Sequence, residues 1–205
     1  MKQINIPYDP DLQIPAESSG KIDQHHWPEN DYRPEGTITL VYSQEALKVR
    51  LWSNIQAPQC KAYQDNGDVW KDTCMELFLK PFAEDPDYIN IECNALGYML
   101  IGKGVDRNNR TLITSALKPH MEVSVALEPG KGWSVEYQIP FQALEEIFGR
   151  ALKPKAGTKL WLNAYLCGDE TPLPHWVAWN RIDIPNPDFH RSDYFGEGVL
   201  ADGTF

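Results

Sequence analysis

Hydrophobic and polar residues alternate along most of the chain beyond residue 36, which is the pattern of strands that bury one face. Short polar segments, many with Gly or Pro, separate these stretches and predict turns. The expected strands cover residues 37–42, 46–52, 74–80, 88–94, 98–101, 121–127, 133–139 and 159–167. The first two of these, and also the sixth and seventh, are close enough in sequence to form hairpins.

Helical spacing of apolar residues occurs in one segment, 141–148, which follows Pro140 and ends at Gly149. Residues 1–36 are rich in Pro, Asp, Glu and Ser without a sustained period, which predicts an irregular leader packed on the body of the protein. No repeat or linker divides the chain. We therefore expect a single domain over residues 1–205: an all-β, antiparallel two-sheet β-sandwich of the immunoglobulin-like or jelly-roll type with one short helix.

Composition and charge narrow the classes of partner. The 205 residues are 42% apolar and 23% charged, as in an ordinary globular protein, and 29 acidic against 19 basic residues give a net charge of -10. An acidic surface repels phosphate backbones and anionic membranes, so we expect no nucleic-acid or membrane partner. No apolar run approaches the ~18 residues of a spanning helix, and the N-terminus lacks a signal-peptide pattern. We expect a soluble monomer without an export signal.

The four cysteines, Cys60, Cys74, Cys93 and Cys167, show no spacing of a metal knuckle or a redox pair. A chain of this size does not need disulfides to fold. We expect four reduced, mostly buried thiols, which favours an intracellular location.

Polar residues share one face of two expected strands. Met75, Leu77 and Leu79 face one way on residues 74–80, which places Glu76 on the other face. Three polar residues of 88–94 also share a face: Asn90, Glu92 and Asn94. Asn and Glu are disfavoured in strands, so their repeated use indicates a functional, wet sheet surface. A sugar site needs such planar polar groups together with aromatic planes, and Trp70 lies just before the first strand.

The segment Trp70-Lys71-Asp72-Thr73-Cys74-Met75-Glu76 resembles the family 9 carbohydrate-binding modules. Residues 132–141, ending in Ile-Pro-Phe, and Phe195-Gly196 are similar to further motifs of that family in the same order. The resemblance spans about residues 37–200. It implies a β-sandwich that holds a glycan end between two aromatic side chains.

The resemblance assigns the two aromatic walls to Trp70 and Phe189, with Phe where the best-known members have Trp. It implies a hydroxyl-binding carboxylate at Glu76, and places Asn90 and Glu92 where the family has an Arg and an Asn. With Asn94 of the same strand face, the expected ligand-binding set is Trp70, Glu76, Asn90, Glu92, Asn94, Asn186 and Phe189. The implied function is non-catalytic binding of a mono- or oligosaccharide in carbohydrate catabolism, with no required cofactor.

Two alternatives remain open. Glu76 and Glu92 would suit a glycoside hydrolase if their strands were neighbours, although the sequence offers no feature that separates their pKa values. Oxygen ligands that suit a structural Ca²⁺ occur in loops at Asp65, Asn66, Asp68, Asp85 and Asp87.

The other tryptophans are expected to serve packing or to lie in the tail. Trp133 and Trp161 lie within strands and are expected in the core, and Trp27 and Trp52 are expected to serve packing. Trp176 and Trp179 stand in the tail, which either packs or folds over the sheet.

Overall fold

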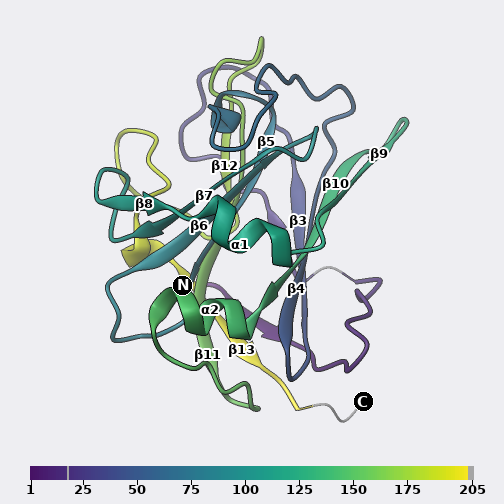
Figure 1. Ribbon diagram of the computed structural model, residues 1–205. Helices are drawn as coiled ribbons and strands as arrows, with labels where there is room; N and C mark the ends of the chain where they lie inside the picture. The colour runs from purple at the N-terminus through teal and green to yellow at the C-terminus, as the bar shows by residue number, and fades with distance from the viewer. Residues whose placement is uncertain (18, 203–205) are drawn as a thin grey trace.

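Two sheets packed face to face form a β-sandwich in the computed structural model, which describes residues 1–17 and 19–202 (Figure 1). The larger sheet has the order β1(Gln3–Ile6), β13(Gly196–Leu200), β11(Lys159–Cys167), β5(Cys74–Lys80), β6(Tyr88–Asn94), β7(Met99–Gly104) and β8(Arg110–Leu112). Its eighth strand, β12(Trp176–Ala178), pairs with the end of β11 that β13 leaves free.

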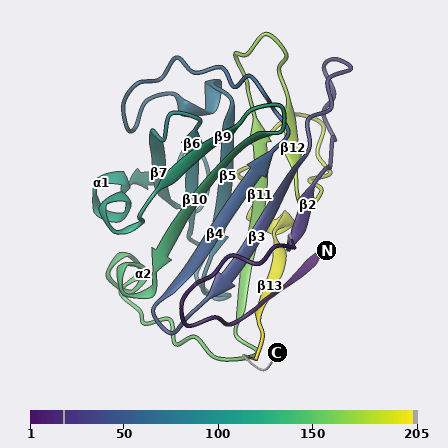
Figure 2. The same ribbon diagram turned by 90° about the vertical axis from the view of Figure 1, so that its right-hand side faces the viewer.

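The smaller sheet covers one face of the larger one (Figure 2). Its order is β2(Gly20–Ile22), β3(Gly36–Tyr42), β4(Ala46–Ser53), β10(Gly132–Pro140) and β9(Ser124–Glu128). Every named strand pair is antiparallel except β1 with β13. The two-sheet antiparallel sandwich expected from the alternating pattern is therefore confirmed.

The expected helix is present as α2(Phe141–Phe148), which ends at Gly149 in a left-handed conformation with φ of 65°. A second, one-turn helix, α1(Thr114–Leu117), was not expected. Three short 3₁₀ turns complete the elements: η1(Val69–Lys71), η2(Lys118–His120) and η3(Ser192–Tyr194). The expectation of one short helix thus needs this small correction.

Residues 1–36 are not wholly irregular, because β1 and β2 join the larger and the smaller sheet. Each has only three or four residues, too few to show a period in the sequence. β8 and β12 are equally short, which is why the sequence did not indicate them. In β13, two glycines interrupt the alternation of apolar and polar side chains.

The main core lies between the sheets, where Leu47, Val49 and Leu51 of β4 are fully buried, as expected. Met75 and Trp133 belong to the same core. A second apolar cluster lies on the outer face of the larger sheet and includes Phe78, Tyr88, Tyr165, Phe189 and Phe195. The outer face is therefore covered by the tail of the chain, and this cover shapes the site described below.

All four cysteines are free, and three of them are buried, as the sequence predicted. Within the described residues, the structure contains no helix that is both long and apolar enough to cross a membrane.

Candidate functional site

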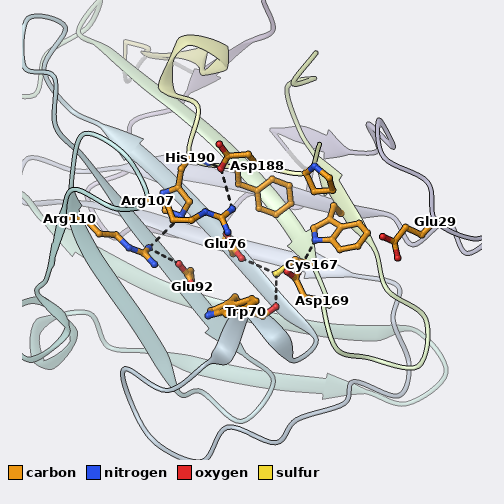
Figure 3. A pocket seen from close by; sticks show the side chains of 13 residues that line it. Glu29, Trp70, Glu76, Glu92, Arg107, Arg110, Cys167, Asp169, Asp188 and His190 are labelled. Atoms are coloured by element: carbon orange, nitrogen blue, oxygen red, sulfur yellow. Dashed lines mark hydrogen bonds and ion pairs between the residues drawn. The ribbon is translucent and has the colours of Figure 1, made fainter. Parts of the chain in front are cut away.

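A cavity of about 420 Å³ opens on the outer face of the larger sheet (Figure 3). Its floor comes from three adjacent strands: Glu76 on β5, Glu92 on β6 and Cys167 on β11. The other lining residues are Glu29, Trp70, Arg107, Arg110, Asp169, Trp176, Pro187, Asp188, Phe189 and His190.

The polar strand face is not wet, in contrast to the expectation. Glu76 and Glu92 are 3% and 2% exposed, and Asn90 and Asn94 are buried as completely. The tail and the loop around η1 cover the face, so the polar groups are desolvated and depend on protein partners.

Glu92 has a defined set of partners. Its Oε1 atom accepts hydrogen bonds from Arg110 Nη1 at 3.1 Å and from Asn90 Nδ2 at 2.9 Å. Its buried Oε2 atom has no partner among the described residues. Burial raises the pKa of Glu92 to about 6, and the Arg110 guanidinium opposes this rise.

Glu76 is less well compensated. It is the cross-strand register partner of Glu92, and its Oε1 atom accepts a hydrogen bond from the Cys167 thiol at 2.9 Å. Burial and the neighbouring Glu92 carboxylate raise the pKa of Glu76 well above its usual range. In Figure 3 its side chain lies between Glu92 and Cys167 on the floor of the cavity.

Asp169 connects two half-buried tryptophans that line the cavity. Trp176 Nε1 donates to Asp169 Oδ1 at 2.8 Å, and the Asp169 backbone N–H donates to the Trp70 carbonyl at 3.5 Å. The Cys167 Sγ atom lies 3.4 Å from the same carbonyl oxygen. The end of β11 and the residues after it therefore hold the Trp176 indole and the Trp70 backbone at one cavity.

Phe189, the expected second aromatic wall, has little free surface. Its ring stacks on Tyr165 with centroids 4.0 Å apart and an interplanar angle of 9°. The Trp27 ring lies 6.2 Å away, and Phe189 is 6% exposed. Phe189 lines the cavity but leaves far less aromatic surface available than the half-buried Trp176.

The three expected asparagines do not line the cavity. Asn94 donates to Ala62 O and Asp72 Oδ2 and accepts from two backbone amides, so its side chain serves the loop structure. Asn90 supports Glu92 through its amide nitrogen. Asn186 is exposed in the tail. Of the seven expected residues, those that meet at the cavity are Trp70, Glu76, Glu92 and Phe189.

Both arginines of the cavity were missed as site residues. The resemblance left the strand without an arginine, and the structure supplies one from β8, because Arg110 reaches Glu92. Arg107, in the preceding loop, pairs with Asp188 at 3.2 Å. The basic composition of residues 102–110 was the available signal, but only the β7–β8 pairing shows which strand face they reach.

His190 lines the cavity next to Arg110 and is buried. Its Nδ1 atom lies 2.7 Å from the Tyr88 hydroxyl, and its Nε2 atom faces Arg110 Nη1 at 3.5 Å. Burial, followed by the positive charge of Arg110, lowers the pKa of His190 to about 3. The imidazole is therefore neutral and acts as a packing and hydrogen-bonding group.

Among the other tryptophans, Trp161 is the one that departs from its expected place. Trp133 is fully buried in the main core, and Trp179 is also buried. Trp161 is only half-buried and packs against the outer cluster, since its position on β11 faces outward. Trp27 packs as expected and donates to the Ile184 carbonyl at 2.7 Å.

The loop residues considered for calcium are spread over separate contacts. Asp65 pairs with Lys118 at 2.5 Å, and Asp87 pairs with Lys103 at 3.0 Å. Asp68 pairs with Lys71 at 3.1 Å. Calcium binding stays a prediction.

Comparison with known structures shows the shared fold. A candidate carbohydrate-binding protein from Bacteroides uniformis ATCC 8492 matches with a TM-score of 0.82 and 22% identity, over 97% of this chain and 99% of that one. A family 9 carbohydrate-binding module from Caldicellulosiruptor kristjanssonii in complex with glucose matches with a TM-score of 0.63 and 14% identity, over 97% and 95%. The module from the same organism in complex with cellotriose gives 0.60 and 14%, over 98% and 94%.

No curated protein shows significant sequence similarity to the chain. The family known as carbohydrate-binding family 9 matches residues 12–200. This match covers nearly the whole chain and includes the strands that form the cavity floor. The chain therefore belongs to carbohydrate-binding family 9.

Proposed function

We propose that the chain binds a mono- or oligosaccharide in this cavity, with Trp70 and Trp176 as aromatic walls, and that it catalyses no reaction. The observation that carries the proposal is the combination in one cavity of two half-buried indoles and a buried carboxylate pair. Sugars present C–H patches on their ring faces and hydroxyls around their edges, so they need both kinds of surface.

The polar groups divide into acceptors and donors. Glu76 and Glu92 accept from sugar hydroxyls, and the buried Glu92 Oε2 atom, which has no protein partner among the described residues, keeps an unused hydrogen-bonding capacity. Arg107 and Arg110, which also line the cavity, donate hydrogen bonds to sugar oxygens. A ligand with many hydroxyl groups can donate to the carboxylates and accept from the arginines.

The family supports this class of ligand. The two Caldicellulosiruptor kristjanssonii structures hold glucose and cellotriose, which makes β-linked glucose the first ligand to test. A cavity of about 420 Å³ lies within the ~300–1,000 Å³ range of small-molecule sites. We place this binding in carbohydrate catabolism, as the family resemblance implies.

A glycoside hydrolase is the second candidate, because burial raises the pKa values of both carboxyl groups, Glu76 and Glu92, as a general acid requires. Their placement argues against it. The two residues are side by side in register on neighbouring strands, whereas glycosidase carboxyls flank the bond that they cleave. Release of reducing sugar by the wild type but not by Glu76→Gln would support the hydrolase instead.

Calorimetric titration with glucose and cellotriose tests the binding proposal. Trp70→Ala and Trp176→Ala should each weaken binding at least tenfold, since each removes a stacking plane. Trp52→Ala is the matched control, because Trp52 is also half-buried but lies on β4 of the smaller sheet, outside the cavity. Absence of binding by the wild type across a glycan array, or unchanged binding by both cavity variants, would contradict the proposal.

A further inference from the structure

Three side chains with metal-ligating atoms converge beneath the cavity: Cys74, Glu76 and Cys167. One ligand atom from each lies within 4.8 Å of the others. Their exposed fractions are 1%, 3% and 1%. Among the described residues, they form the only such group of three or more His, Cys, Asp or Glu side chains.

Strand pairing fixes this arrangement. Cys74 and Cys167 are register partners on β5 and β11, and Glu76 follows Cys74 by two residues, so all three side chains share the outer sheet face. Ligands on paired strands keep their spacing better than ligands on loops. Glu76 and Cys167 also line the cavity, which gives an ion a route of entry.

The charges of the floor favour a cation. The Glu76 carboxyl accepts one hydrogen bond within the described residues, from a thiol, which is a weak donor. Its register partner Glu92 has one buried oxygen without any partner among those residues. Arg110 bonds to Glu92, and no basic side chain among the described residues forms an ion pair with Glu76, although the positive charge of Arg107 acts on it from across the cavity. A buried carboxyl group with so little compensation either keeps its proton or gains a cation as a partner, and a metal ion that displaces the proton supplies that charge.

We propose that Cys74, Glu76 and Cys167 bind one Zn²⁺ ion, with a fourth coordination position open to the cavity. Two sulfur ligands and one carboxylate suit this borderline-soft ion. Tetrahedral geometry with Zn–S bonds of ~2.3 Å places ligand atoms about 3.8 Å apart. The observed group needs only small side-chain adjustments to reach this spacing, since its atoms lie within 4.8 Å of one another.

Proton balance defines a signature of binding. Each thiol must lose its proton to become a ligand, and Glu76 must be ionised. Binding one Zn²⁺ therefore releases two thiol protons, together with any proton on Glu76, to the buffer. The open position then holds water or a ligand oxygen from the cavity.

Cobalt titration tests the site directly. Chelator-treated, reduced full-length chain is titrated with Co²⁺ in the absence of sugar. We expect a thiolate-to-cobalt charge-transfer band that saturates at one equivalent and disappears when Zn²⁺ is added. Cys167→Ser should lose at least half of the band intensity, and Glu76→Gln should weaken cobalt affinity at least tenfold.

The remaining cysteines supply the matched control. Cys93 faces the main core, and Cys60 lies in a loop, so the double variant C60S/C93S should keep the full band. The inference is overturned if the wild type gives no band, if C60S/C93S loses it, or if Cys167→Ser leaves it unchanged. Should Cys167→Ser not fold, the wild type, C60S/C93S and Glu76→Gln decide the question.

This inference goes beyond the proposed carbohydrate binding, and the two fail separately. Cobalt binding without any sugar binding contradicts the proposed function alone. Sugar binding by chelator-treated protein that gives no cobalt band contradicts the metal site alone.

Discussion

Glu76 and Glu92 are register partners on adjacent strands, and only Glu92 has an arginine partner within the described residues. Two buried carboxyl groups therefore share the floor of one cavity with unequal compensation. The two carboxyl groups therefore differ in their role: Arg110 fixes Glu92, whereas Glu76 is open to a ligand.

Arg110→Ala should destabilise the protein, because it leaves the Glu92 carboxylate buried with only Asn90 as a partner. Removing one member of a buried ion pair costs about 3–5 kcal/mol, and Arg110 keeps 18% side-chain exposure, so we expect about 2–3 kcal/mol. Urea denaturation at neutral pH measures the loss. The double variant Arg110→Ala/Glu92→Gln should recover much of it, and a double variant no more stable than Arg110→Ala would refute this account.

Asp169→Ala should weaken carbohydrate binding about three- to tenfold, because the Trp176 indole loses its hydrogen-bond acceptor. Asp169→Asn keeps a side-chain oxygen that accepts from the indole and should bind nearly as the wild type does. Calorimetric titration of both variants makes the comparison. Equal losses in the two variants would show that the charge of Asp169, and not the placement of Trp176, matters.

Phe189→Ala should affect stability more than binding. The Phe189 ring stacks on Tyr165 and is 6% exposed, and truncation of a buried Phe typically costs about 3–5 kcal/mol. We expect a loss of about 3 kcal/mol in the free energy of unfolding, measured by denaturation. The folded fraction should still bind sugar more tightly than Trp70→Ala does. A weaker affinity than that of Trp70→Ala would restore Phe189 as a principal wall.

His190 should make stability depend on pH in acid. Its pKa is lowered from an ordinary 6.5 to about 3, so the unfolded chain binds the proton more readily than the folded one. The contribution is full above about pH 6.5 and is lost as pH falls toward 3, at up to about 1.4 kcal/mol per pH unit.

His190→Gln isolates this effect from the carboxyl groups, which also titrate in acid. Denaturation of both proteins between pH 6.5 and pH 4 compares the two slopes of unfolding free energy against pH. The variant should show the shallower slope. Parallel slopes would mean that His190 is already protonated in the folded protein.

Local patterns in the sequence indicated the long strands and the helix with little error. Alternation marked β5 and β6, and helical spacing with Pro140 and Gly149 marked both ends of α2. The same alternation placed Glu76 and Glu92 on a common face, and strand pairing confirms that they are neighbours. These features depend on residues a few positions apart, so they can be read from the chain itself.

Tertiary structure decided which residues meet at the cavity and which become buried. The pairing of β12 with β11 places Trp176 opposite Cys167, and the β7–β8 pairing allows Arg110 to reach Glu92. The polar strand face is buried because the tail folds over it, whereas its alternation is the same as that of a solvent-facing strand. Contacts between distant segments depend on the sheet order and on the path of the tail, and no local period encodes either of them.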